Sequence, residues 1–229
     1  MKFKFFKKSF TLAEVVMVMG IIGIVAMLTV TNARKDTDVA EKVMQLKKCD
    51  EIISAAFAQA VAENGNIITW GENGVYPDKT VVWNIISSYL KLQKNCGVDN
   101  GCWRSGNIGS LPSSDMDPAA IESDCVSGIL SNGASVAIGR IINPTGDAVF
   151  DIFVDVDGPN KGTYRFGDDV FGFYITNEGE VFPDGFNNLT ECRTSQGVYC
   201  TAWVLTFGNQ DYLKKCGETL NWDTKQSCK

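Results

Sequence analysis

Residues 9–30 read SFTLAEVVMVMGIIGIVAMLTV, and this stretch decides the architecture of the chain. A short basic segment with four lysines, residues 1–8, precedes it. The residues from Phe10 to Val30 are mostly apolar, and a helix of about 20 apolar residues spans a bilayer. The one charged side chain among them is Glu14. We therefore expect an N-terminal membrane helix that carries a single carboxylate near its start.

Two ordinary interpretations of this stretch leave Glu14 unexplained. One is a secretory signal, with a basic start, an apolar core and a small-residue cleavage site at Thr31-Asn32-Ala33. The other is a plain membrane anchor. A carboxylate in a spanning helix costs up to roughly 2.5–3.5 kcal/mol at the bilayer centre, so such residues are rare and usually functional. A third interpretation has to give Glu14 a role.

The N-terminal segment resembles that of type IV pilins and type II secretion pseudopilins. The resemblance rests on the basic leader, on Phe-Thr-Leu-Ala-Glu at 10–14 and on Ile-Ile-Gly-Ile at 21–24. It implies that prepilin peptidase cleaves between Ser9 and Phe10 and that the new N-terminal amine is methylated. It also implies that Glu14 meets the N-terminal ammonium of a neighbouring subunit during assembly. The chain departs from the family in having Ser9 where Gly is usual and Thr31 where Pro is frequent.

The resemblance implies a structural subunit of a type II secretion pseudopilus or of a type IV pilus-like filament. Such a subunit is a single-pass protein of the bacterial inner membrane, with its globular domain in the periplasm or, after assembly, on the cell surface. Its expected partners are prepilin peptidase, other pilin or pseudopilin subunits and the inner membrane. The alternative is a membrane-anchored or secreted binding module, adhesin-like or lectin-like, that does not polymerise.

The expected fold is α+β, with a long N-terminal helix packed on an antiparallel sheet. The predicted parts are a leader (1–9), a transmembrane and assembly helix (10–30), its amphipathic continuation (31–64) and a globular domain (65–229). Apolar residues at helical spacing mark the continuation, among them Val43, Leu46, Ile53 and Phe57. The sequence Glu63-Asn64-Gly65 is typical of a helix end.

Beyond this helix the sequence predicts one short helix and then a run of strands. Pro77-Asp78 opens the short helix, and Asn132-Gly133 is a hairpin turn between two strands. The segment from Cys96 to Pro118 is expected to be a loop, and residues 184–229 a disulfide-stapled, loop-rich tail. The five predicted strands are Ser127–Leu130, Ala134–Ile142, Val149–Val156, Val170–Thr176 and Glu180–Phe182.

Cysteine usage and charge restrict the compartment and the partners. The chain has eight cysteines and no histidine, which behind a membrane segment favours an oxidising location and up to four disulfides. Cys96–Cys102 and Cys192–Cys200 are candidate local pairs among 105 possible pairings. Loss of the leader removes four lysines and no carboxylate, so the formal net charge changes from −6 to −10. Nucleic acid is therefore not an expected partner.

Oxygen-bearing side chains gather around one predicted inter-strand loop. They are Asp155, Asp157, Asn160, Asp168 and Asp169. Hard oxygen ligands on a flexible loop suit calcium, although the spacing is not that of an EF-hand. Some pseudopilins, which the chain resembles, hold calcium in a loop beside their sheet. The competing interpretation is a structural turn, because Asp, Asn, Gly and Pro are ordinary turn formers. No other cofactor is expected.

An enzymatic function is not expected. Without histidine a Ser-His-Asp triad cannot form, and no nucleotide-binding glycine motif occurs. Asp115 with Asp117, or Asp168 with Asp169, would serve as glycosidase acids only at a suitable spatial separation. Aromatic residues near the cysteines have two interpretations, a binding surface or the cover of a small core. They are Trp103, Trp203, Tyr212 and Trp222.

Overall fold

A computed structural model describes residues 12–71, 76–106, 108–109, 121, 125–141, 148–194 and 197–228. The side chains of residues 25–36, 140–141 and 194 lie outside this description. The chain divides into two compact units, residues 1–39 and residues 40–229. Helix α1 (Leu12–Asn64) supplies the described residues of the first unit and continues into the second.

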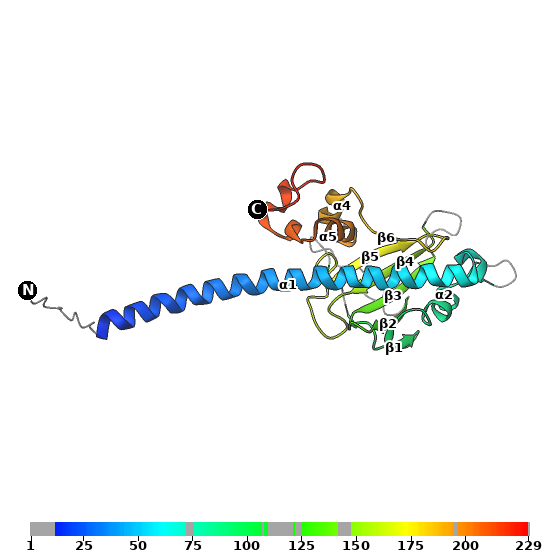
Figure 1. Ribbon diagram of the computed structural model, residues 1–229, viewed down its shortest axis with the longest axis horizontal. Coiled ribbons are helices and arrows are strands. Elements are labelled where there is room, and N and C mark those ends of the chain that lie inside the picture. Colours follow the sequence, from blue (N-terminus) through cyan, green and yellow to red (C-terminus); the bar gives the residue numbers. More distant parts are fainter. Residues whose placement is uncertain are drawn as a thin grey trace, which may run out of the picture. The chain divides into compact units, whose positions relative to one another are not determined.

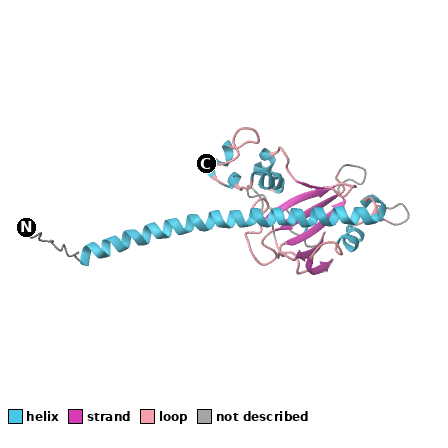
Figure 2. Cartoon of the chain, in the orientation of Figure 1, coloured by secondary structure: helices cyan, strands magenta, loops and turns pink. Residues whose placement is uncertain are grey.

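The second unit is an α+β domain built on one six-stranded antiparallel sheet (Figures 1 and 2). The strands follow the chain in the order β1-β2-β3-β4-β5-β6, so each strand pairs with the next. All five pairings are antiparallel, and the predicted α+β class with an antiparallel sheet is confirmed. The strands are β1 (Leu92–Gly97), β2 (Val126–Leu130), β3 (Ser135–Ile141), β4 (Phe150–Asp155), β5 (Val170–Ile175) and β6 (Val181–Pro183).

The part of α1 beyond residue 40 packs on this sheet through a buried stripe. Asn132, in the turn after β2, donates hydrogen bonds to Gln45 Oε1 at 3.1 Å and to Cys49 Sγ at 3.4 Å. The stripe recurs every three or four residues, as one face of a helix requires. Its buried members are Val43, Leu46, Cys49, Ile53, Ala56, Phe57 and Ala60.

The opposite face of the sheet is also covered. Ala137 and Val170 belong to a buried cluster with Trp103 and Phe166, which come from the loops that precede β2 and β5. Successive side chains of a strand point to opposite faces, so the buried neighbours Val136 and Ile138 face the other way. The sheet is therefore the middle layer of the domain.

The predicted helix ends are confirmed at both sites that the sequence marks. α1 ends at Asn64, and Gly65 has a φ of +78° while its N–H donates to the Val61 carbonyl at 2.8 Å. Such a left-handed residue after a helix suits glycine. Asp78 caps α2 (Lys79–Ile86) by accepting from the Thr80 and Val81 N–H groups at 2.8 and 2.9 Å.

Five strands coincide with the predicted strands, whereas β1 does not. The segment that includes Cys96 was expected to be a loop, but residues 92–97 form an edge strand paired to β2 with two register irregularities. The central residues of β1 are exposed and polar, so the segment lacks the apolar alternation that identifies a strand in sequence.

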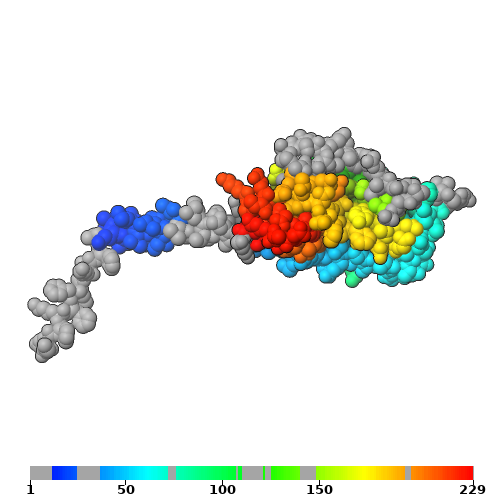
Figure 3. Space-filling model, turned by 90° about the horizontal axis from the view of Figure 1, so that it is seen from above, coloured from blue at the N-terminus to red at the C-terminus, as the bar shows by residue number. Residues whose placement is uncertain are grey.

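The C-terminal part of the domain combines short helices with loops. Its helices are α4 (Leu189–Thr194) and α5 (Thr201–Phe207), and the 3-10 turns are η2 (Val198–Cys200), η3 (Asp211–Leu213) and η4 (Lys215–Thr219). Each of these helices is shorter than two turns. Such short elements are compatible with the loop-rich tail that the sequence predicts. Figure 3 shows the last residues, in red, beside the orange segment around α4. Phe186 and Trp222 connect the two, with ring centroids 5.5 Å apart.

Three disulfides staple the domain. The two predicted local pairs, Cys96–Cys102 and Cys192–Cys200, are confirmed, and Cys216–Cys228 is the third. Cys49 and Cys125 are buried thiols, so the possible fourth bridge is absent. Burial raises the pKa of the Cys49 thiol to about 11, which keeps it protonated and unreactive at neutral pH.

Candidate functional site

The N-terminal part of α1 presents apolar side chains around its whole circumference. The five consecutive residues Val15–Met19 are 39 to 69% exposed. Successive residues are rotated by about 100°, so five of them cover every side of a helix. The exposed large apolar residues of this part are Leu12, Val15, Val16, Met17, Val18, Met19, Ile21, Ile22 and Ile24. A helix that is apolar all round is stable only in an apolar environment.

Glu14 lies in the first turn of this helix and is exposed there. Ser9 and Phe10, the two residues of the predicted cleavage site, lie outside the described residues. Among the residues that the structure describes, no helix combines the length and the apolar character that crossing a membrane requires.

The acidic side chains predicted from the sequence converge beside the sheet. Asp155 ends β4, and Asp168 and Asp169 stand in the turn before β5. A Cβ on Gly162 would collide with the Oδ2 atoms of both Asp157 and Asp169. These two carboxylates therefore lie close together, and Gly162 leaves the space between them open. We call Asp155, Asp157, Asp168 and Asp169 the acidic cluster. Asn160 lies on the same loop but is exposed.

Lys42 of α1 supplies a positive charge to the acidic cluster. Its ammonium is 2.6 Å from Asp168 Oδ1 and 3.9 Å from Asp157 Oδ2, and its side chain is 15% exposed. Burial alone would lower the pKa of Lys42, but the hydrogen bond to Asp168 and the nearby carboxylates raise it above its ordinary value. Lys42 thus stays charged and ties α1 to the turn before β5.

Asp169 organises this turn from inside the protein. It is fully buried, and its carboxylate accepts from the Tyr164 and Arg165 N–H groups at 2.7 and 2.6 Å and from the Thr163 hydroxyl at 3.1 Å. Hydrogen bonds from backbone N–H groups compensate a buried carboxylate for the water it has lost. This part of the cluster is the structural turn that the sequence allowed.

The burial of the Asp155 carboxyl is less well compensated by hydrogen bonds. Its Oδ1 accepts from the Asp157 N–H at 3.1 Å, but the buried Oδ2 has no hydrogen-bond partner within the described part of the chain. Burial, together with the charges of Asp169 and Asp157, raises the pKa of the Asp155 carboxyl to about 8. Lys42 therefore faces the carboxylates of Asp157, Asp168 and Asp169. Asp155, with a pKa of about 8, is mostly protonated at neutral pH.

This donor set fits a cation only in part. The space left by Gly162 and the orphaned Asp155 oxygen favour one, with Asp155, Asp157 and Asp169 as the residues that would hold it. Asp168 is already engaged by Lys42 and by the Thr163 hydroxyl. In the described ranges no group of three His, Cys, Asp or Glu side chains is arranged to hold a metal ion. Calcium binding stays a prediction.

The contact with Lys42 was missed by sequence reasoning. Lys42 and Asp168 are 126 positions apart in the sequence. A lysine that flanks a buried stripe is common on any helix surface, so no local pattern distinguishes this one.

A groove of ≈ 320 Å³ adjoins the acidic cluster, and Asp157, Asn160 and Glu41 are among its lining residues.

The aromatic residues near the cysteines mostly fill the core. Trp103, Trp203 and Tyr212 are between 0 and 6% exposed. The Trp103 N–H donates to the Tyr164 hydroxyl at 2.7 Å, and the rings of Trp203 and Trp222 meet edge to face, 5.5 Å apart. Of the two interpretations of these aromatics, the cover of a small core is the one the burial supports. Asp115 and Asp117, considered as acids, lie outside the described residues.

Comparison with known proteins identifies no relative. No protein-family model, no curated protein and no solved structure matches the chain.

Proposed function

We propose that this chain is a pilin-like or pseudopilin structural subunit of the bacterial inner membrane. In this proposal prepilin peptidase removes residues 1–9, and the N-terminal helix holds the subunit in the bilayer and later joins a filament. The filament is a type II secretion pseudopilus or a type IV pilus-like fibre. The globular domain then lies in the periplasm or on the cell surface, and the protein has no catalytic role.

The observation that carries this proposal is the apolar surface around the first turns of α1. Residues 15–24 expose apolar side chains in every direction, whereas Glu14 stands at their N-terminal end. A bilayer covers such a helix before assembly, and packed helices of neighbouring subunits cover it afterwards. The disulfide-stapled domain after the helix suits an oxidising compartment.

The first experiment is to determine the N-terminal sequence and the intact mass of the protein recovered from its native membrane. We expect a chain that begins at Phe10 and carries one added methyl group. A chain that begins at Arg34 would be the product of ordinary secretion. That result would refute processing by prepilin peptidase and favour the binding module that does not polymerise. An intact Met1 would indicate a static anchor.

Calcium at the acidic cluster is a separate part of the proposal. The cluster carries more negative charge than Lys42 balances, so a divalent cation between Asp155, Asp157 and Asp169 would stabilise the folded state. We expect calcium to raise the melting temperature of the wild-type protein and a chelator to reverse the change, because a ligand that binds only the folded state stabilises it.

The variant Asp157→Asn should lose the response to calcium, while Asp99→Asn, at an exposed aspartate outside the cluster, should keep it. If the wild-type protein melts at the same temperature in calcium and in chelator, the proposal of calcium binding is refuted. Lys42 would then be the sole counter-ion that the cluster requires.

A further inference from the structure

A second charged site lies in the C-terminal part of the domain. It is a hollow of ≈ 330 Å³ between the turn before β5, helix α4 and the segment from η3 to η4. Four of the seven lining residues are cationic, in a chain whose formal net charge is −6. We call it the cationic hollow. Its lining residues are Arg165, Arg193, Tyr212, Leu213, Lys214, Lys215 and Glu218.

Three of the four cations of the cationic hollow form no ion pair within the described residues. Lys214 pairs with Asp211 Oδ1 at 2.7 Å. Within the described residues, no carboxylate lies within ion-pair distance of Arg165, Arg193 or Lys215, and the one acidic residue in the lining is Glu218. Like charges gathered at one place repel each other, and an anion between them relieves that repulsion.

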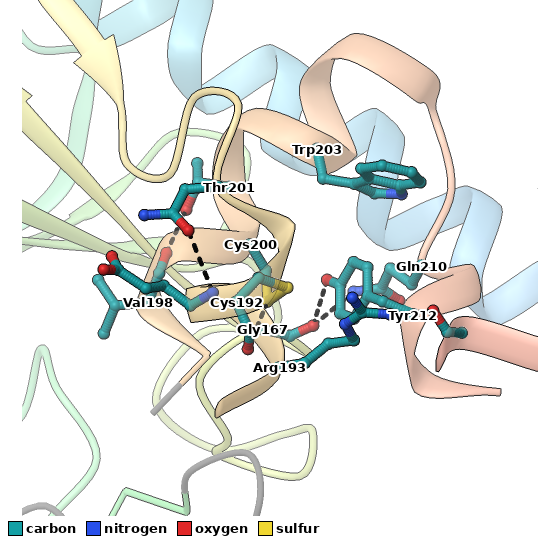
Figure 4. Close-up of a disulfide and its surroundings, with 12 residues drawn as sticks. Gly167, Cys192, Arg193, Val198, Cys200, Thr201, Trp203, Gln210 and Tyr212 are labelled. Carbon is teal, nitrogen blue, oxygen red and sulfur yellow. Dashed lines mark hydrogen bonds between the residues drawn. A yellow bond between two sulfur atoms is a disulfide. The ribbon is translucent and has the colours of Figure 1, made fainter. Parts of the chain in front are cut away.

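The walls of the cationic hollow are held in place before any ligand arrives. Arg193 follows Cys192 of the Cys192–Cys200 disulfide, and its guanidinium donates to the Gly217 carbonyl. The Tyr212 hydroxyl donates to the Gly167 carbonyl at 2.5 Å. Figure 4 shows Arg193 and Tyr212 beside Gly167 next to the disulfide. A guanidinium has five N–H donors, so Arg193 keeps donors for a ligand after its bond to Gly217.

The loop that carries Arg165 is fixed as well. The Arg165 N–H donates to Asp169 Oδ1 at 2.6 Å, while its side chain is exposed at the hollow. Lys215 precedes Cys216 of the Cys216–Cys228 disulfide. The cations thus project from three separate segments whose backbones are held by disulfides and a buried carboxylate. Binding would cost little reorganisation.

We propose that the cationic hollow binds an oxyanion group, that is, phosphate, sulfate or carboxylate. Guanidinium groups bind these anions through paired N–H donors, and Lys215 adds a point charge. The side chain of Leu213, which is 38% exposed, adds an apolar contact beside the cations. The oxyanion is carried by a free inorganic ion or by an acidic sugar. This proposal does not depend on filament assembly.

The test is isothermal titration of the full chain in an uncharged detergent at low ionic strength. The probes are sodium sulfate, sodium phosphate and a trisaccharide of uronic acids. The test variant is Arg165→Gln/Lys215→Gln, and the control is Lys47→Gln/Lys91→Gln, which removes the same charge from exposed lysines outside the hollow. We expect the wild type and the control to bind with similar affinity. The test variant should bind at least about tenfold more weakly, because it loses charge-assisted hydrogen bonds.

Binding of sulfate and phosphate by themselves would identify a site for free ions, and binding of the trisaccharide alone would identify an acidic sugar as the ligand. The proposal is overturned if no probe binds the wild type, or if the test variant binds as tightly as the control. Lys215→Gln alone is the second variant if the double variant fails to fold, and it should weaken binding in the same direction. The proposal would also be overturned if a folded Lys215→Gln variant bound the probes as tightly as the wild type and added salt did not weaken its binding.

Discussion

Replacing Glu14 with alanine should abolish incorporation of the subunit into filaments and leave the globular domain folded. Glu14 is the one carboxylate between residues 10 and 30, and the side chains from Val15 to Ile24 around and beyond it are apolar and exposed. In an apolar environment a lone carboxylate costs a few kcal/mol, and a cation that pairs with it offsets that cost. In the proposed pilin-like assembly, this cation would be the N-terminal ammonium of a neighbouring subunit at Phe10.

The measurement is the amount of subunit in sheared filaments relative to the amount in membranes. Glu51→Ala is a matched control, because Glu51 is an exposed carboxylate farther along the same helix, paired with Lys48 at 3.2 Å. It should assemble like the wild type. Glu14→Gln keeps the size and removes the charge, so it should fail as Glu14→Ala does if charge is what matters. Normal filaments from the Glu14→Ala variant would refute the assembly role and favour a binding module that does not polymerise.

Local features of the fold were predictable because each depends on a few neighbouring residues. The hairpin at Asn132-Gly133 is one case, since Gly133 adopts a φ of +90° in the turn between β2 and β3. The end of α1 at Gly65 is another. The two short disulfide loops also join neighbours in sequence. In each case the residue types alone restrict the backbone, and the structure agrees.

Features that depend on the packed fold were not predictable. The buried thiols Cys49 and Cys125 lie on α1 and in the cluster around Trp103, and no local pattern shows that they form no disulfide. The ion pair of Lys42 with Asp168 joins segments that are 126 positions apart in the sequence. The acidic cluster was visible as a set of residues, but its counter-ion was not.

The cationic hollow had no signal in the sequence at all. Its cations come from three separate segments, and Arg165 and Lys215 are 50 positions apart. The net acidic charge argued against nucleic acid as a partner. A net charge, however, is an average over regions whose local charges differ. Near the two C-terminal disulfides the fold groups four cationic residues, in a chain whose average charge is negative.

Replacing Gly185 with alanine should destabilise the domain by about 3–5 kcal/mol, since strain at a positive φ and a steric clash act together. Gly185 has a φ of +86°, and a Cβ there would collide with the backbone carbonyl of Tyr199. Backbone cannot rotate away as a flexible side chain can. The contact lies where the residues after β6 meet η2, next to the Cys192–Cys200 disulfide. Urea unfolding followed by circular dichroism measures the change in the free energy of unfolding.

Gly133→Ala is the matched control for this prediction. Gly133 has an equally left-handed φ of +90°, but a Cβ there would have no atom within 4 Å. It therefore measures the backbone strain alone, about 1–2 kcal/mol. The difference between the two variants isolates the cost of separating Gly185 from Tyr199. Equal losses at both positions would show that the C-terminal segment moves aside freely, and the preformed walls of the cationic hollow would then lose their physical basis.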